Sequence, residues 1–389
     1  MIPYGRQNIS EADIATVVEV LRSDWLTQGP IVPSFEEKIS SYCGAKYGVA
    51  ANSATSALHM ACLALGLGPG GRVWTSPTTF LASANCALYC GASVDFIDID
   101  PRTCNISVEK LTDKLVNAKR AGQLPNIVIP VHLCGQSCEM EAIDALAKEF
   151  GFRVIEDASH AIGGTYRGEA IGSCKYSDVT VFSFHPVKII TSGEGGMAMT
   201  NDDRVAMAMA RYRSHGVTAE PTAMQVRPPE EIWNYQQLEL GFNYRMTDIH
   251  AALGISQLER IDSFVSCRRA VAARYDDLLS DLPAHSLWQH PDTASSYHLY
   301  PIRVLESECG LSQKDVYHAL RGRGVGVNLH YIPVYLHPYY ERLGFRRGYC
   351  EEAERYFHEA LSLPIFPDLN EEDQLGIVNS IQAVLEGQL

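Results

Sequence analysis

Short β-rich runs alternate with helical segments through the first two hundred residues, and this alternation constrains the fold more than any other feature of the sequence. The predicted strands cover residues 47–51, 73–76, 94–98, 127–132, 154–157, 179–185 and 196–200. Helical periods lie between them, for example over residues 53–65 and 139–150. Strands that alternate with helices pair mainly in parallel, because each connection must cross back over the sheet. The sequence therefore predicts an α/β fold with a mostly parallel central sheet.

The rhythm changes after residue 213. Residues 214–243 contain Pro221, Pro228 and Pro229 and show no clear period, so we expect a long ordered loop. A long helical pattern then runs from Thr247 to about Leu279, with Thr247 or Asp248 as its cap. Predicted strands at 298–304 and 325–331 and helices at 312–320, 351–361 and 371–385 follow. We expect a large domain over 1–246 and a smaller α+β domain over 247–389, entered through the long helix.

A capping-box spacing near the N-terminus predicts the start of one more helix. Ser34 stands three residues before Glu37, and Phe35, Ile39 and Tyr42 follow at helical spacing. We therefore expect this helix to begin at Ser34.

Charge and composition exclude several classes of protein. The 389 residues carry 46 acidic and 32 basic side chains, a net charge of −14, which repels nucleic acid. No apolar run approaches the roughly 18 residues of a membrane span, and no secretory signal pattern is visible, so we expect a cytoplasmic protein. The 11 cysteines lack zinc-site spacing and read as reduced thiols, so we expect no metal.

Familiar catalytic motifs are missing from the sequence. The glycine-rich run at 66–71 follows a helix and precedes a strand, which is the reverse of a dinucleotide-binding turn. The chain has no Walker A, HExxH or GxSxG pattern. Hydrolysis by a metal or by a nucleophilic serine therefore has no support.

Lys188 stands among apolar residues just beyond a predicted strand. Val187, Ile189 and Ile190 surround it, and a glycine-rich turn at 193–196 follows. Desolvation in such a setting lowers the pKa of an amine and makes it nucleophilic. The alternative is a lysine whose stem packs while its ammonium group reaches water, and only the surrounding residues distinguish the two.

Two other strand ends carry groups that match a nucleophilic lysine. Asp157 ends the strand predicted over 154–157, where a carboxylate can keep a pyridine nitrogen protonated. Residues 52–56 follow a strand and open a helix, so their N–H groups and hydroxyls suit a phosphate. Alone, Asp157 could equally be a turn residue and Ser53 a helix cap. Together with Lys188 they indicate catalysis with pyridoxal phosphate.

With these residues in place, the chain resembles the DegT/DnrJ/EryC1/StrS family of sugar aminotransferases over nearly its full length. The matching stretches are 26–30, 52–56, 77–80, 156–160, 183–188, 193–196 and 241–248. The resemblance implies fold type I of the pyridoxal-phosphate-dependent transferases, like aspartate aminotransferase. It also implies a homodimer whose subunits share active sites.

The resemblance also implies roles for individual residues. It makes Lys188 the residue that binds the cofactor aldehyde, Asp157 the partner of the pyridine nitrogen, and Phe80 the ring that stacks on the cofactor. His160 would lie near the ring hydroxyl, where many members carry Gln. The phosphate would be held by Ala54, Thr55 and Ser183, and by Asn243 of the neighbouring subunit.

Segments 2–7, 184–188 and 327–340 most resemble family members of pseudaminic-acid biosynthesis. We therefore expect transfer of the amino group of L-glutamate to C4 of a UDP-linked 4-keto-6-deoxy-N-acetyl amino sugar. The lysine at 188 places the chain with the transaminases, because the family's dehydratases carry histidine there. The expected substrate contacts are Tyr4, Thr27, Gln28, Arg245, His330 and Tyr331.

Alternatives stay open at the substrate site. Arg245 suits the UDP phosphates because a guanidinium binds phosphate through two hydrogen bonds, but it could instead form a salt bridge at a dimer interface. His330 could be a packed core histidine. The substrate could be another UDP-, dTDP- or GDP-linked 4-keto sugar, and a non-catalytic sensor with the same fold is a further alternative.

Overall fold

The computed structural model describes residues 1–226, 230–231 and 233–387. Its centre is a seven-stranded sheet in the order β1-β9-β8-β5-β4-β2-β3. The strands are β1 (Tyr47–Ala51), β2 (Arg72–Thr75), β3 (Ser93–Phe96), β4 (Ile127–Ile129), β5 (Arg153–Asp157), β8 (Val179–Ser183) and β9 (Gly196–Thr200). β9 runs antiparallel to both neighbours, and every other pair is parallel. The predicted mostly parallel sheet is confirmed, with all seven strands present.

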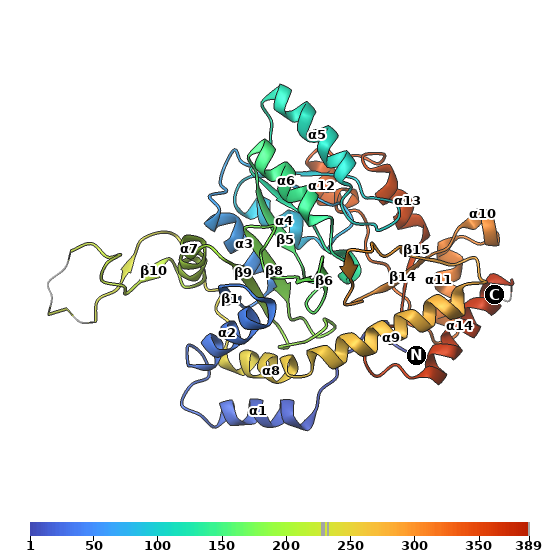
Figure 1. The fold of residues 1–389 in the computed structure, drawn as a ribbon, viewed down its shortest axis with the longest axis horizontal. Coiled ribbons are helices and arrows are strands. Elements are labelled where there is room, and N and C mark those ends of the chain that lie inside the picture. Colours follow the sequence, from blue (N-terminus) through green and yellow to red (C-terminus); the bar gives the residue numbers. More distant parts are fainter. Residues whose placement is uncertain (227–229, 232, 388–389) are drawn as a thin grey trace.

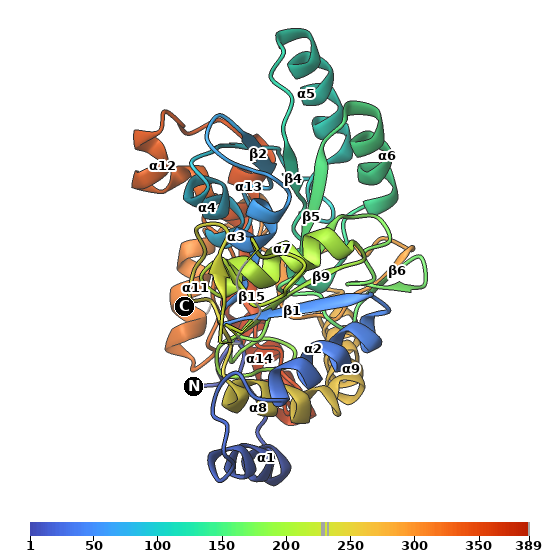
Figure 2. The ribbon, with the colours of Figure 1, turned by 90° about the vertical axis from the view of Figure 1, so that its left-hand side faces the viewer.

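Helices cover both faces of this sheet (Figures 1 and 2). They are α2 (Ile31–Cys43), α3 (Ala54–Ala64), α4 (Ala82–Tyr89), α5 (Val108–Ala121), α6 (Met140–Phe150) and α7 (Asp203–Arg213). Strand side chains alternate between the faces, so α3 packs with Ile155 and its neighbours while α6 packs with Val154 on the other side. Both faces are apolar because both are covered.

The helix predicted from Thr247 to Leu279 is wrong in one respect, because it is two helices. α8 (Asp248–Leu258) begins after Thr247, whose side chain accepts a hydrogen bond from the His250 N–H, as predicted. α9 (Ile261–Leu279) begins after a break at Arg260, whose guanidinium binds Asn8 and Asp13 of the N-terminal segment. The apolar period continues across the break, so the sequence pattern does not reveal it.

The helix predicted to start at Ser34 begins earlier, at Ile31, and Ser34 does not cap it. The carboxylate of Asp248 instead accepts hydrogen bonds from the N–H groups of Gly29 at 2.6 Å and Val32 at 2.9 Å. A side chain more than two hundred residues away thus takes the role of a cap, and a local spacing rule cannot find it.

The C-terminal part carries a second sheet, in the order β12-β14-β15. Its strands are β12 (His285–Ser286), β14 (Tyr300–Arg303) and β15 (Ala360–Leu363), and its main helices are α11 (Gln313–Gly322), α13 (Glu351–Glu359) and α14 (Glu371–Leu385). The strand predicted at 325–331 is wrong, because only single bridges form, at Val325 and Asn328. β15 occupies the place beside β14, and it includes residues predicted to end a helix.

The N-terminal segment lies against this C-terminal part in both views. Ile2 forms a parallel bridge with Val325, and the Ile365 N–H donates to the Tyr4 carbonyl at 3.0 Å. α1 (Glu11–Leu21) then packs on the outer side of α8 (Figure 1). The division of the chain at 246/247 stays a prediction.

The predicted loop at 214–243 contains an element and is corrected here. β10 (Val217–Thr218) and β11 (Gln236–Gln237) form an antiparallel pair in a segment that projects from the molecule (Figure 1). Strands of two residues are too short to show a period in the sequence. Pro221 lies in this segment, whereas Pro228 and Pro229 lie outside the described residues.

The remaining elements are short connectors. They are β6 (Thr165–Tyr166), β7 (Glu169–Ala170), β13 (Thr293–Ala294), α10 (Glu306–Cys309), α12 (Pro338–Arg342) and the 3₁₀ turns Leu133–Gly135 and Val334–Leu336. Over the part of the chain that the structure describes, no helix combines the length and apolarity needed to cross a membrane.

Candidate active site

Three strands of the large sheet, β1, β8 and β5, bring their C-terminal ends together at one edge of the sheet. Ala51 at the end of β1 and Ser183 at the end of β8 both pair with Gly196 at the start of β9. Asp157 ends β5, the next strand, opposite Val181 of β8. The C-terminal edge of an open α/β sheet is where such folds bind ligands. Residues as far apart in the chain as Ala51 and Ser183 therefore share one site.

Lys188 follows β8 in a turn, and its backbone N–H donates to the His185 carbonyl at 2.9 Å. Burial lowers the pKa of its amine to about 8, and the negative charge of nearby Asp157 opposes this only in part. The residue is half-buried, and its chain neighbours Ile189 and Ile190 are buried. A lysine with this pKa has a useful share of neutral, nucleophilic amine near neutral pH.

The Asp157 carboxylate is buried and held by hydroxyl groups. Its Oδ2 accepts a hydrogen bond from the Ser83 hydroxyl at 2.6 Å, and its Oδ1 accepts one from the Ser159 hydroxyl at 2.6 Å. The Ser159 N–H adds a third at 3.1 Å. Three donors therefore hold this carboxylate in one orientation. The sequence analysis missed Ser83, because it lies 74 residues away on α4.

The N-terminus of α3 forms a cradle for an anion. Ser53 caps the helix by accepting from the Ser56 N–H at 3.1 Å, while the N–H groups of Ala54 and Thr55 have no carbonyl partner within their own helix. Gly196 passes so close that a Cβ there would lie 2.4 Å from the Ala54 nitrogen. The structure thus brings Ala54, Thr55 and Ser183 to one place, as a phosphate site requires.

His160 is buried and its protonation can be assigned from its contacts. Its Nδ1 accepts from the Cys134 N–H at 3.3 Å, and its Nε2 lies 3.1 Å from the Tyr331 hydroxyl. Burial, and then the charge of Lys188, hold the pKa of His160 well below its usual value. The neutral ring therefore carries its proton on Nε2 and donates to Tyr331, which leaves the Tyr331 hydroxyl proton free to point elsewhere.

Phe80 and His330 complete the aromatic wall around Tyr331. The Phe80 ring is 60% exposed and lies 6.4 Å from that of Tyr331, so its face is available to a flat ligand. His330 is buried, packs against Tyr4 and pairs with the Ser362 hydroxyl at 2.8 Å. Burial lowers the pKa of His330 to about 3, so it is neutral. His330 thus has the contacts of a packed histidine, as in the alternative left open above, although it faces Tyr331.

Arg245 and Gln28 line a cavity of about 260 Å³ that also contains Arg213 and Glu36. Arg213 and Glu36 form an ion pair, whereas Arg245 has no hydrogen bond or ion pair with the described residues. Thr27 forms an antiparallel β-bridge with Thr247, which places it close to Arg245 and this cavity. Ser214, which lines the same cavity, forms a bridge with Asn243. Arg213 is a further cation that the sequence analysis missed, because nothing in its helix marks it.

The predicted residues therefore fall into two groups. Lys188, Asp157, His160, Ser183 and the α3 N-terminus line the strand edge, together with the wall formed by Phe80, Tyr331, His330 and Tyr4. Gln28 and Arg245 line the second cavity, and Thr27 lies next to it. The exposed Asn243 borders both groups, because its carbonyl accepts a hydrogen bond from the Asn52 side chain at 3.4 Å, just before the α3 N-terminus. Among the described residues, no group of His, Cys, Asp and Glu side chains could hold a metal ion.

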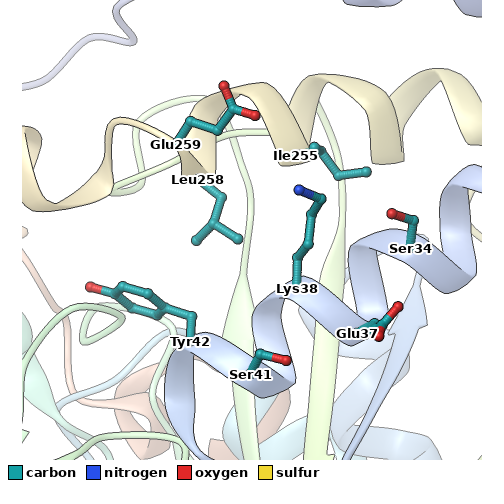
Figure 3. Close-up of a pocket in the computed structure, with 8 residues that line it drawn as sticks. All are labelled: Ser34, Glu37, Lys38, Ser41, Tyr42, Ile255, Leu258 and Glu259. Carbon is teal, nitrogen blue, oxygen red and sulfur yellow. The ribbon is translucent and has the colours of Figure 1, made fainter.

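A larger open groove of about 620 Å³ lies elsewhere, between α2 and α8 (Figure 3). Its lining includes Lys38 and Tyr42 of α2, Leu258 at the end of α8, and Glu259 just after it. No residue from a strand end contributes to it, so it is not the site described above.

Comparisons with known proteins agree with this geometry. The model of the DegT/DnrJ/EryC1/StrS aminotransferase family matches residues 7–382. The chain is 36% identical to the spore coat polysaccharide biosynthesis protein SpsC of Bacillus subtilis, over 99% of this chain and 97% of that protein. It is also 36% identical to the UDP-4-amino-4,6-dideoxy-N-acetyl-beta-L-altrosamine transaminase of Campylobacter jejuni, over 99% and 98%.

A solved structure with a similar fold is that of Helicobacter pylori PseC, an aminotransferase involved in the biosynthesis of pseudaminic acid. It superposes with a TM-score of 0.89 at 31% identity and covers 99% of each chain. The fold expected from the sequence, that of the pyridoxal-phosphate-dependent aminotransferases, is confirmed.

Proposed function

This chain belongs to the DegT/DnrJ/EryC1/StrS aminotransferase family, and on that premise we propose that it moves the amino group of L-glutamate to C4 of a UDP-linked 4-keto-6-deoxy-N-acetyl amino sugar. The family's enzymes act on sugars and depend on pyridoxal phosphate, so the reaction class and cofactor are those of a sugar aminotransferase. The observation that carries the catalytic assignment is that the half-buried Lys188, whose amine pKa is lowered to about 8, lies within electrostatic reach of the buried Asp157 carboxylate at the same edge of the sheet.

The residues at the sheet edge fit the cofactor. The buried Asp157 carboxylate at the end of β5 would hold a pyridinium, and Gly196 leaves room for a phosphate at the α3 N-terminus. When bound, pyridoxal phosphate supplies an aldehyde and an electron-accepting ring. Ala54, Thr55 and Ser183 would hold its phosphate, Phe80 would cover its ring, and His160 would lie near its hydroxyl.

Lys188 and Asp157 would do the acid–base work. A lysine with a pKa of about 8 can both take and return a proton near neutral pH, so Lys188 would move the proton at the substrate α-carbon. Asp157 would hold the proton on the ring nitrogen. Positioned proton transfer contributes about 10²- to 10⁴-fold, so Lys188→Ala should lose at least that.

Charge supports the placement of the nucleotide. The protein has a net charge of −14, so cationic side chains near the substrate must offset the two phosphates of the nucleotide. Arg245 in the 260 Å³ cavity suits this role, because it has no hydrogen-bond or ion-pair partner among the described residues. Tyr4, Thr27, Gln28, His330 and Tyr331 would make the remaining substrate contacts. The Campylobacter relative's name favours a UDP-linked amino sugar, whereas the Bacillus relative's name points to spore coat polysaccharide, so another nucleotide sugar is the second candidate.

The test is a comparison of substrates. Purified protein with L-glutamate and a panel of UDP-, dTDP- and GDP-linked 4-keto sugars should give an amino sugar only from the UDP-linked N-acetylated substrate, detected by mass spectrometry. Turnover of only a dTDP- or GDP-linked sugar would overturn the substrate assignment. Arg245→Gln should raise KM for the nucleotide sugar by about tenfold, the loss of one charge-assisted contact, and leave KM for glutamate unchanged.

We also propose that the active unit is a homodimer. Asn243 is exposed on this chain, and the segment around β10 and β11 carries exposed apolar side chains, including Trp233 at 75%, Tyr235 at 66% and Leu240 at 78%. A projecting apolar segment of this kind is typical of a surface that a second protein covers.

Mixing two inactive variants tests whether Asn243 acts across the dimer. Lys188→Ala and Asn243→Ala subunits, unfolded together and refolded, should regain activity, because one site of each hybrid dimer then has both Lys188 and the partner's Asn243. Each variant refolded alone is the control. No recovery, although hybrids form, would show that Asn243 serves its own subunit.

A further inference from the structure

Both oxygens of the Asp157 carboxylate are already occupied by hydroxyl donors. Ser83 donates to Oδ2 and Ser159 to Oδ1, each at 2.6 Å, which is at the short end for an O–H···O hydrogen bond. The Ser159 N–H donates to the same Oδ1 at 3.1 Å. The carboxylate thus accepts hydrogen bonds from two serines, one on α4 and one in the turn after β5.

The direction of these hydrogen bonds follows from the groups present. Ser83 is fully buried, and its hydroxyl also lies 2.8 Å from the hydroxyl of buried Thr79. Ser83 donates its single proton to Asp157, so the Thr79 proton points to Ser83. The chain Thr79–Ser83–Asp157 therefore has one consistent polarity, which ends on the carboxylate.

The other charged groups near Asp157 do not replace these donors. The Lys188 ammonium group is within electrostatic reach, but its charge is lost once its amine is neutral. Tyr331 is also close, and burial raises the pKa of its hydroxyl, so it stays neutral. Glu156, the neighbour in β5, points to the opposite face of the sheet, where it binds His132 at 2.7 Å.

From this geometry we propose that Ser83 and Ser159 are positioning residues that keep the shared proton on the cofactor's ring nitrogen instead of on Asp157. The inference rests on the proposed placement of Asp157 at that nitrogen. Hydrogen bonds to a carboxylate make it a weaker base, so the proton remains on the ring. A protonated ring withdraws electrons more strongly, which is what transamination needs.

The test measures the ring nitrogen directly in the holoenzyme. Ser83→Ala, Ser159→Ala and the double variant are loaded with ¹⁵N-labelled pyridoxal phosphate, and the ¹⁵N chemical shift at pH 7.5 reports the protonated share. Loss of one hydrogen bond to a charged group should move the equilibrium between ring and carboxylate about 10- to 100-fold toward the carboxylic acid. The shift should therefore move toward that of neutral pyridine, furthest in the double variant, and kcat should fall with it.

Two controls separate this role from a structural one. Ser256→Ala removes an equally short, buried serine hydrogen bond, to Asp13 at 2.6 Å, away from the sheet edge. It should lower thermal stability without moving the ¹⁵N shift. Ser159→Thr keeps a hydroxyl at a half-buried position and should retain the wild-type shift.

The outcomes distinguish this inference from the proposed function. An unchanged ¹⁵N shift in a double variant that binds cofactor would overturn the role of the two serines and leave the aminotransferase assignment intact. A wild-type protein that binds the cofactor but converts no sugar would overturn the proposed function instead.

Discussion

Replacing Lys188 with methionine should make the cofactor-free protein more stable, and the gain should shrink as the pH rises. The amine has a pKa of about 8 in the folded protein, against 10.5 for an ordinary lysine. The folded state therefore disfavours the protonated amine, and below pH 8 this penalty is present in full. It is relieved as the pH rises from 8 toward 10.5.

The size of the effect follows from the two pKa values. One unit of pKa difference corresponds to about 1.4 kcal/mol, so the penalty is about 3 kcal/mol at pH 7 and about 1.4 kcal/mol at pH 9.5. These are upper values, because Lys188 keeps some contact with water. Methionine has a similar shape and no charge, so the variant should gain most of this energy at pH 7 while losing transamination.

The assay is urea unfolding of the cofactor-free wild type and Lys188→Met at pH 7 and pH 9.5. Changes in packing do not depend on pH, so the argument rests on the difference between the two pH values, which should approach 2 kcal/mol. Lys314→Met, at an exposed lysine of α11, is the matched control and should show no such difference. Parallel pH profiles for wild type and Lys188→Met would refute the claim that Lys188 is desolvated.

Three further predictions concern the carboxylates and the phosphate cradle. Asp157→Asn should bind cofactor but lower the single-turnover rate by at least about 10²-fold, the scale of one positioned acid–base group; a near-normal rate would contradict its role at the ring. Gly196→Ala should weaken cofactor retention in dialysis at least tenfold, because its Cβ would lie 2.4 Å from the Ala54 nitrogen; normal retention would mean that the phosphate lies elsewhere. Burial alone would raise the pKa of Asp13, but hydrogen bonds from Ser256, Ser10 and Gln257 lower it below 3.8. The ionised carboxylate therefore stabilises the folded protein above about pH 4, and this contribution is lost as the pH falls further. Asp13→Asn should therefore cost about 1 to 3 kcal/mol at pH 7 and flatten the decline in stability below pH 4 in urea unfolding, whereas an unchanged acid profile would exclude this pairing.

Local order in the chain was enough to predict which groups stand at the sheet edge. The β-rich runs ending near Ala51, Asp157 and Ser183 were visible in the sequence, and parallel strands place their ends together. The same reasoning failed for the long helix, because an amphipathic period continues unchanged across the break at Arg260. It also failed at 325–331, where β-rich residues stay unpaired because β15 takes the place beside β14.

The sequence by itself determined the alternating architecture, the family and the positions of Lys188 and Asp157, because periodicity and short motifs depend on neighbours in the chain. Only the tertiary structure decided what surrounds these two side chains. The hydrogen bond from Ser83 to Asp157 joins residues 74 positions apart, and the one between His160 and Tyr331 joins residues 171 positions apart. Asp248 caps α2 from more than 200 positions away. Hydrogen bonds depend on distances of a few ångströms, and those distances exist only after the chain has packed.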